Sequence, residues 1–410
     1  MYRLLMKELT KQSQSNVRDN NLRFILNTII QEEPLSRADI VRATRMSKPT
    51  VSNLTDHLIR RGIISEIGMG ESQGGRKPIL LRFNSTLRYL IAFEMGRVGY
   101  RIAIADLKGN LLKKIDGEYD LRIGLHERLE MTKDRTLGGL YDLGLDLREI
   151  LKIICIAPGV YVERGQEMKW YPVTDGRDLR DMRGYFQKNF HHEVIFDHST
   201  KLSLLGEKIR GKARGYENVL YIDFAYGLGC SFMIDGNVYF GSNNSAGEIG
   251  YFYSNLDEFT RGTIVPCELG ALEMNLSGYA LRRKGMEAAE RHPDSQILTL
   301  VRGEINRVTA KTVFEAALLD DQAATNILKE SFSYFNMALC NVINLLTPEL
   351  VILGGGFSNA GDLLLSLIEQ EIGDKVLMMP QIVISDLKND ASIIGGVHYL
   401  IQNTDFLREL

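Results

Sequence analysis

Two segments of this chain repeat the same strand-forming pattern, and that repetition limits the available folds more than any other feature. Residues 89–115 and residues 218–242 each contain short β-branched and aromatic runs separated by glycine-containing turns, which is the pattern of hairpin strands. A further apolar run follows each segment, at residues 149–162 and 349–372. The second of these runs continues through a glycine-rich turn into a helical pattern. This succession predicts a duplicated α/β body with a cleft between two lobes.

Size and composition indicate a chain of several domains without a membrane span. With 410 residues the chain is too long for one ordinary core, and 44% hydrophobic with 25% charged residues is typical of globular proteins. No apolar run reaches roughly 18 residues, and charges interrupt the start where a signal peptide would be apolar. The four cysteines lie far apart without a Cys-x-x-Cys pair, which favours reduced thiols. We therefore expect a cytoplasmic location and no membrane contact.

The first 84 residues differ from the rest of the chain in charge. They contain 14 Lys and Arg against 8 Asp and Glu, a net charge of +6, whereas the whole chain has a net charge of −3. A basic head on an acidic body favours a polyanionic partner for the head. Small surface domains also vary in charge by this amount, so the charge alone does not identify the partner.

The head has the helix pattern of a winged helix-turn-helix. Residues 17–31 place apolar side chains on one helical face. Ser36 predicts the start of a second helix, because Asp39 follows it in the spacing of a capping box. Ser47 predicts the start of a third helix, which should stop near Gly62. The second and third helices are then joined by a tight turn.

The third helix has an apolar and a polar face. Val51, Leu54, Thr55 and Leu58 share one side at about 100° per residue and should face the core. Small polar groups near the start of the opposite face are what a major groove admits, and Asn53 is suited to pair with adenine. Together with the wing, the residues that we expect to contact DNA are Lys48, Pro49, Thr50, Ser52, Asn53, His57, Arg60, Arg76 and Lys77.

A wing should follow the third helix. Residues 63–68 and 79–83 predict two strands, and the loop between them ends in Arg76 and Lys77, two cations suited to phosphates or a narrow minor groove. Two points stand against DNA binding. Winged helices also serve as protein-docking modules, and Asp56 places a carboxylate on the polar face, where phosphates repel it unless it accepts from cytosine. The cations at the wing and at the helix start favour DNA.

From about residue 88 to residue 402 the chain resembles the ROK family, named for repressors, open reading frames and kinases. The resemblance rests on IDFAYGLGCSFMIDGNVYFGSNNSAGEIGY, on PELVILGGGFSNAGDLL and on DASIIGGVHYL, which follow the family's order. With GGRKP in the preceding wing, the chain resembles the transcriptional-regulator branch. The resemblance implies an α/β fold, the actin-like (ribonuclease H-like) two-lobed sugar kinase fold, behind a winged-helix DNA-binding domain. We expect the head at 1–84, the small lobe at 85–195, and the large lobe at 196–410 with its C-terminal helix returning to the small lobe.

The resemblance also implies that catalysis has been lost. In the kinases the base is an aspartate in a pattern like ENDANAAALGE, and alignment on Gly206 places Asp197, His198 and Ser199 under Glu, Asn and that base. A serine hydroxyl has no useful basicity near neutral pH, and a missing base costs about 10² to 10⁴ in rate. Asp197 is a carboxylate, but it lies two residues before Ser199, so its side chain has a different position and direction from that of the base. We therefore expect no catalytic residue.

The two loops that hold phosphates in the kinases also depart from the family. In the first loop Arg97 replaces a glycine that allows close phosphate approach, and Val98 removes a hydroxyl. In the second loop Ala225 and Tyr226 again remove a hydroxyl and add a bulky ring. Together with Ser199 these changes predict that the protein is not an enzyme and needs no cofactor.

The sugar kinases and many repressors of the family that this chain resembles carry a structural zinc, bound by a His after GEIG and by three cysteines in a CxCGxxGCxE pattern. Here those positions hold Tyr251, Ile264, Pro266 and Ala271, and Cys267 falls at a non-ligand position. A tetrahedral zinc site needs four nitrogen or sulfur donors. We expect no metal.

Two carboxylates that contact sugar in the family are kept, Glu248 and Glu273. Carboxylates accept hydrogen bonds from sugar hydroxyls and give direction in a cleft. The alternative is a solvated carboxylate or, for Glu248, a structural partner of nearby backbone amides. The substitutions His198 and Tyr251 lie at matching contact positions. The expected effector-binding residues are His198, Ser199, Glu248, Tyr251 and Glu273.

These observations favour a DNA-binding transcriptional regulator, in the first place a repressor, of sugar-utilisation genes. Its partners would be a double-stranded DNA operator, a small carbohydrate effector and a second copy of the chain in a homodimer or higher homo-oligomer, because paired half-sites need matched symmetry. One alternative is an active ATP-dependent hexose kinase that also binds DNA. Another is a DNA-binding protein without a ligand, whose body only dimerises.

Overall fold

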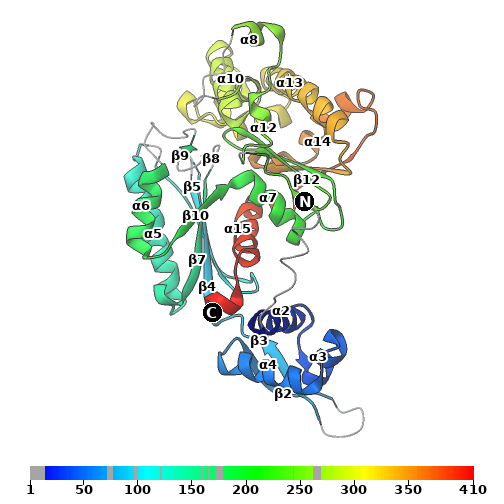
Figure 1. Ribbon diagram of the computed structural model, residues 1–410. Coiled ribbons are helices and arrows are strands. Elements are labelled where there is room, and N and C mark those ends of the chain that lie inside the picture. Colours follow the sequence, from blue (N-terminus) through cyan, green and yellow to red (C-terminus); the bar gives the residue numbers. More distant parts are fainter. Residues whose placement is uncertain are drawn as a thin grey trace.

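The computed structural model describes residues 14–71, 77–96, 99–120, 122–157, 161–164, 167–170, 179–242, 244–261 and 269–410. In Figure 1 the head lies at one end of the molecule, the first lobe follows it and the second lobe lies at the other end. Within these ranges no helix has both the length and the apolar character needed to cross a bilayer.

The head folds in the predicted element order. Its elements are α2 (Gln14–Glu32), β1 (Leu35–Ser36), α3 (Arg37–Thr44), α4 (Lys48–Arg60), β2 (Ile64–Met69) and β3 (Ile79–Phe83). The strands form one antiparallel sheet in the order β1-β3-β2. Both predicted caps are confirmed: Ser36 and Asp39 form a reciprocal capping box, and the Ser47 hydroxyl accepts from the N–H of Thr50. These caps satisfy amides that have no partner inside the helix.

The body contains two sheets with the same topology. The first has the order β10-β7-β4-β5-β6 and the second has the order β13-β12-β11-β14-β15. In each, the first strand of the lobe pairs antiparallel with the next strand and parallel with a later one. The predicted duplication is therefore confirmed. The strands are β4 (Tyr89–Met95), β5 (Gly99–Asp106), β6 (Leu111–Glu118), β7 (Ile150–Ala157), β10 (Val194–His198), β11 (Val219–Phe224), β12 (Leu228–Ile234), β13 (Asn237–Val238), β14 (Leu350–Gly355) and β15 (Gln381–Ile384).

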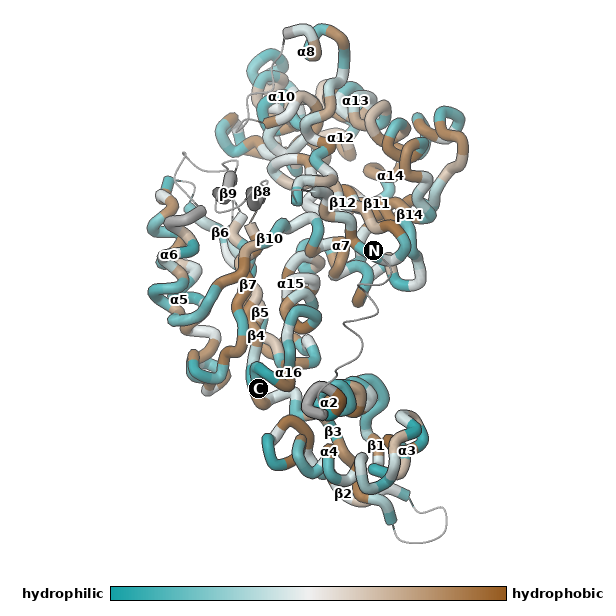
Figure 2. Tube along the Cα trace, in the orientation of Figure 1, coloured by the Kyte–Doolittle hydropathy of each residue, from teal (hydrophilic) through white to brown (hydrophobic). Residues whose placement is uncertain are grey.

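Helices cover the sheets and bury their apolar strands, which Figure 2 shows as brown segments inside each lobe. The first lobe carries α5 (Leu125–Asp142), α6 (Leu179–Phe190), and the hairpin β8 (Tyr161–Arg164) and β9 (Glu167–Trp170). The second lobe carries α8 (Leu256–Arg261), α9 (Ala271–Asn275), α10 (Gly278–Arg291), α11 (Gln296–Leu300), α12 (Ala310–Leu318), α13 (Gln322–Leu346) and α14 (Asp362–Ile372). Short 3-10 turns are η1 (Leu147–Glu149), η2 (Ile249–Tyr251), η3 (Ile305–Arg307), η4 (Gly356–Ala360) and η5 (Lys388–Asp390).

Two helices join the lobes, α7 (Ser199–Arg210) and α15 (Ala391–Gln402). The first continues directly from β10 and contacts strands of the second sheet, whereas the second follows β15 and contacts strands of the first sheet. They lie side by side in the middle of the molecule (Figure 1). A side chain on Gly206 would overlap the Ala391 carbonyl, and one on Gly395 would overlap the Leu202 carbonyl. The two glycines therefore allow the close crossing of these helices.

The head is attached to the first lobe and to the last helix, α16 (Phe406–Glu409). The rings of Phe83 and Phe406 lie 5.5 Å apart, and Arg23 forms an ion pair with Asp405 at 2.5 Å. Apolar side chains of the head, of β4 and β5 and of α15 form one continuous core. Because β10 runs to His198, the expected lobe boundary between residues 195 and 196 falls inside this strand.

Candidate functional site

The polar face of α4 is open and its apolar face is buried. Val51, Leu54, Thr55 and Leu58 are buried, as their spacing predicted. On the other side Lys48, Pro49, Ser52, Asn53 and Arg60 are exposed, and Thr50 and His57 are half-buried. The described part of the wing includes Lys77, which is exposed, whereas Arg76 lies outside the described residues. The helix thus presents the expected small polar groups at its exposed start.

Arg37 forms an ion pair with Asp56, the carboxylate on the polar face of α4 that phosphates would repel. Its guanidinium contacts Asp56 at 2.7 Å and Glu66 at 3.1 Å, and its Nε donates to the Thr55 hydroxyl at 3.1 Å. A carboxylate already paired with a cation repels phosphate less than a free one. Sequence reasoning did not select Arg37, because the residues that it contacts lie on two other elements, α4 and β2.

His57 differs from the other residues expected on the DNA face. It lines a hollow together with residues of α2 and α16, at the junction of the head and the body. Burial lowers its pKa, and the nearby charges of Arg18, Arg61 and Arg60 lower it further. The imidazole is therefore neutral at neutral pH.

The segment that corresponds to the kinase base lies at the passage from β10 to α7. Asp197 and His198 are buried at the end of the strand, and Ser199 is the first residue of the helix. The backbone N–H of His198 donates to Oδ1 of Asp197 at 2.7 Å. Burial raises the pKa of Asp197, and this hydrogen bond and the charge of Lys201 oppose the rise. The Asp197 carboxylate is thus held by its own neighbour.

Neither Ser199 nor His198 is a suitable proton acceptor at the start of α7. Ser199 has only a hydroxyl there, and burial together with the charge of Lys201 lowers the pKa of His198 to about 3. A group with so low a pKa is a weak base at neutral pH, whereas an efficient general base has a pKa near the operating pH.

Lys201 is a site residue that sequence reasoning missed. Its side chain is buried, with 2% of the residue exposed, and its ammonium donates to the backbone carbonyl of Asn244 and lies 3.3 Å from that residue's side-chain oxygen. Burial lowers its pKa, and the charges of Asp197 and Glu248 oppose this. Lys201 therefore ties α7 to the loop that carries Glu248. A lysine among Leu202, Leu204 and Leu205 was the available signal.

Glu248 is a half-buried carboxylate near this lysine. Burial raises its pKa to about 7, the charge of Lys201 lowers it, and the charge of Glu273 raises it. No described residue donates a hydrogen bond to it. Tyr251 follows in η2 and is half-buried. The carboxylate of Glu248 can therefore accept a hydrogen bond from a ligand.

Glu273 is used differently. Its Oε1 accepts from the N–H of Leu228 at 2.8 Å and its Oε2 accepts from the N–H of Gly270 at 2.9 Å. Burial raises its pKa, and these two hydrogen bonds oppose the rise. A side chain on Gly227 would overlap the same carboxylate. Glu273 thus fixes the turn between β11 and β12 against the start of α9. This is the structural role that we considered as the alternative for Glu248, and here it is found at Glu273.

A second group of carboxylates lies where the two lobes meet. Glu94 on β4 accepts from Arg101 at 2.5 Å and from the Ser392 hydroxyl at 2.7 Å. Asp223 on β11 is half-buried. Desolvation raises its pKa to about 7, the charge of Glu94 raises it and the charge of Arg101 lowers it. Arg97 and Val98 of the first phosphate loop lie outside the described residues. In the second loop the ring of Tyr226 packs against Tyr279 at 5.7 Å.

The positions of the family's zinc ligands do not fit the metal. Tyr251 and Ala271 supply no nitrogen or sulfur ligand, and residues 264, 266 and 267 lie outside the described ranges. No group of three His, Cys, Asp or Glu side chains in the described part of the chain is arranged to hold a metal ion. The described cysteines, Cys155, Cys230 and Cys340, are buried and free.

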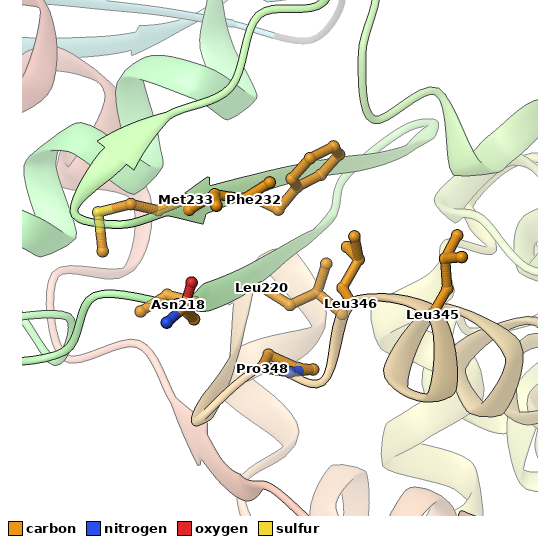
Figure 3. Close-up of a pocket in the computed structure, with 9 residues that line it drawn as sticks. Asn218, Leu220, Phe232, Met233, Leu345, Leu346 and Pro348 are labelled. Atoms are coloured by element: carbon orange, nitrogen blue, oxygen red, sulfur yellow. The ribbon is translucent and has the colours of Figure 1, made fainter.

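A cavity of about 200 Å³ lies beside β11, β12 and the end of α13 (Figure 3). Leu220, Phe232, Met233, Leu346 and Pro348 are among the residues that line it. None of the expected effector residues lines this cavity. It is therefore separate from the candidate effector site at the β10–α7 passage.

Comparisons with known proteins agree with this architecture. The sequence profile described as "ROK family" matches residues 91–403. The xylose repressor of Bacillus spizizenii is 25% identical over 368 residues, which is 88% of this chain and 89% of that protein. The glucokinase of Halalkalibacterium halodurans is 28% identical over 321 residues, 75% of this chain and 94% of that protein.

A solved structure resembles both the head and the body. The crystal structure of a ROK family transcriptional regulator, titled a homologue of the E. coli MLC protein, has a TM-score of 0.71 at 24% sequence identity. The match covers 94% of this chain and 96% of that one. The predicted fold class is confirmed by this likeness. The glucokinase, in contrast, has no counterpart for about a quarter of this chain.

Proposed function

The chain belongs to the ROK family, as its motifs predicted, and we propose that it is a DNA-binding transcriptional regulator of sugar-utilisation genes. The xylose repressor matches it across head and body, which supports a repressor in the first place. The cleft would hold a small carbohydrate as a signal, without transferring phosphate to it. Binding can change DNA affinity only if the carbohydrate prefers one of two conformations.

One observation supports the proposal most strongly: Asp197, His198 and Ser199, at the β10–α7 passage, lack the properties of a catalytic base. Ser199 is a hydroxyl at the position of the base, His198 is buried with a pKa of about 3, and Asp197 accepts from the His198 amide. Phosphoryl transfer to a sugar hydroxyl needs a residue that accepts its proton or orients it. A site without such a residue can still bind the sugar.

The effector-binding residues remain part of the proposal. Glu248 supports it best, because its carboxylate is half-buried and its pKa is raised to about 7. His198, Ser199 and Tyr251 would add hydrogen bonds from neighbouring elements. Glu273 would act mainly through the turn that it holds. The name of the xylose repressor supports a small carbohydrate as the class of ligand.

We also propose that the regulator acts as a homodimer in the cytoplasm. Two recognition helices bind paired half-sites when the protein has matching two-fold symmetry. On each copy, the exposed start of α4 and the wing residue Lys77 would contact the duplex. Lys48, Pro49, Thr50, Ser52, Asn53, His57, Arg60 and Arg76 complete the proposed DNA-contacting set.

The test combines a thermal-shift screen of pentoses, hexoses and amino sugars with operator binding. We expect one sugar to raise the unfolding midpoint by several degrees and to change the affinity for operator DNA. If no sugar stabilises the protein while DNA still binds, the body serves only for dimerisation.

An ATP-dependent hexose kinase that also binds DNA is the second candidate, supported by the 28% identity to a glucokinase. Incubation with ATP, Mg²⁺ and each hexose distinguishes it from the regulator. Turnover that a Ser199→Ala or Asp197→Asn substitution abolishes would establish the kinase.

A further inference from the structure

We propose that the junction between the head and the C-terminal helix binds a phosphate group. The junction contains a hollow of about 110 Å³ with walls from α2, α4 and α16. Its ionisable lining consists of Arg18, Asp19, Arg23, His57, Arg61 and Arg408. None of these residues belongs to the candidate effector site at the β10–α7 passage.

The charge of the hollow is not balanced. Asp405, next to it, pairs with Arg23 at 2.5 Å and with Arg408 at 3.4 Å. Four guanidinium groups thus face two carboxylates, those of Asp19 and Asp405, which leaves a net charge of +2 when His57 is neutral. Within the described residues no ion pair joins Arg18 or Arg61 to an acid.

The pKa of His57 is lowered in part by the positive charges around the hollow. Burial lowers its pKa first, and the charges of Arg18, Arg61 and Arg60 lower it further. Three cations that lower the pKa of one imidazole indicate a local field that favours an anion. An anion in the hollow would reverse part of this effect and raise the pKa of His57.

The size and the donors of the hollow suit a phosphate group. A volume of about 110 Å³ corresponds to only a few water molecules at about 30 Å³ each. Guanidinium groups bind phosphate oxygens in pairs of parallel hydrogen bonds. Because Arg18 and Arg61 belong to the head and Arg408 to the last helix of the body, one phosphate would hold the two parts together.

Two sources can supply this group, a free phosphate or phosphomonoester and the backbone of bound DNA. The test for the first source uses the full-length protein without DNA, so it does not depend on the proposed function. Unfolding midpoints are measured with sodium phosphate against sodium chloride at matched ionic strength. We expect a saturable rise of about 1–3 °C in millimolar phosphate, together with a higher pKa of His57 in NMR titrations.

Substitutions assign the effect to the hollow. Arg61→Ala and Arg408→Ala should each abolish most of the rise, whereas Arg307→Ala, an exposed arginine of the second lobe, should keep it. The side chain of Arg408 is 80% exposed, so Arg408→Ala should leave the fold intact. This variant therefore tests the site even if Arg61→Ala destabilises α4.

A measurement of DNA binding tests whether a phosphate of the DNA backbone occupies the hollow. If a backbone phosphate occupies the hollow, Arg61→Ala and Arg408→Ala will both weaken binding to any duplex and lower the salt slope by about 1. The proposal is overturned if phosphate stabilises all four proteins equally or not at all, and Arg408→Ala also binds DNA like the wild type.

Discussion

Glu94 and Asp223 occupy equivalent positions in the two halves of the body. Each is the last residue but one of the first strand in its sheet, Glu94 in β4 and Asp223 in β11. The charge of Glu94 contributes to the raised pKa of Asp223, so the two carboxyls interact across the seam of the lobes. Duplication of one strand pattern thus brings two acids together where the two lobes meet.

This relationship predicts a pH-dependent stability. The pKa of Asp223 is about 7 in the folded protein and 3.8 in its ordinary state, so the folded state binds more protons between these values. Stability from Asp223 is therefore present at low pH and is lost as pH rises towards about 7. Asp223→Asn should raise the unfolding midpoint by about 2–5 °C at pH 8 and by about a third as much at pH 5, because 1.2 of the 3.2 pH units between the two pKa values lie below pH 5.

Asp294→Asn serves as the control for this pH series, because Asp294 is exposed. It should change the midpoint equally little at both pH values. If Asp223→Asn gives the same shift at pH 5 and pH 8, Asp223 is charged throughout and the interaction with Glu94 is absent.

Glu248 and Glu273 should separate ligand binding from stability. Glu248→Gln removes a free acceptor and should weaken carbohydrate binding by about tenfold with little change in unfolding, because a lost hydrogen bond to a charged group contributes about 1.5–3 kcal/mol. Glu273→Gln replaces a carboxylate that accepts from two amides and should lower stability by about 1–2 kcal/mol. Isothermal titration measures carbohydrate binding, and urea unfolding measures stability. If Glu248→Gln lowers stability and Glu273→Gln only weakens carbohydrate binding, the roles assigned to the two residues are reversed.

Lys201 should be essential for the geometry of the effector site. Lys201→Met removes the cation near Asp197 and Glu248 and the bond to Asn244, so we expect a loss of about 1–3 kcal/mol in unfolding free energy. It should also raise the pKa of Glu248 further, since Lys201 lowers it. Lys188→Met is the matched control, because Lys188 is an exposed lysine on α6. Unchanged stability and carbohydrate affinity in Lys201→Met would remove this role.

Asn53 and Lys77 should affect DNA binding in different ways. Asn53→Ala should relax discrimination at one base pair by about 1–3 kcal/mol, because it removes a contact to a base. Lys77→Ala should weaken binding to every sequence and lower the salt slope by about 1. Competition binding over a set of operator variants at several salt concentrations measures both. Wild-type behaviour in both variants would mean that α4 and the wing do not contact DNA.

The sequence predicted what depends on local spacing. The caps at Ser36 and Ser47, the buried side of α4 and the repeated strand pattern all follow from residues within a few positions of each other. It did not predict contacts between distant segments, such as Lys201 with Asn244 or Arg23 with Asp405. Residues 43 and 382 positions apart meet only because of how the lobes and the head pack, and no periodicity encodes that packing.

The sequence also could not decide between two uses of the same type of side chain. Glu248 and Glu273 are both carboxylates after glycine-rich turns, yet only Glu273 accepts from two backbone amides. That difference arises from the position of α9 against the turn between β11 and β12. A structure is needed to see which carboxylate has free lone pairs.

The central claim is that the cleft binds a sugar but does not phosphorylate it. The direct measurement titrates the purified protein with each sugar and then incubates every sugar that binds with ATP and Mg²⁺, while sugar phosphate is quantified by mass spectrometry. We predict binding that changes operator affinity and sugar phosphate at the level of the protein-free control. Turnover that disappears in Ser199→Ala or Asp197→Asn, with binding of the sugar retained, would contradict the account.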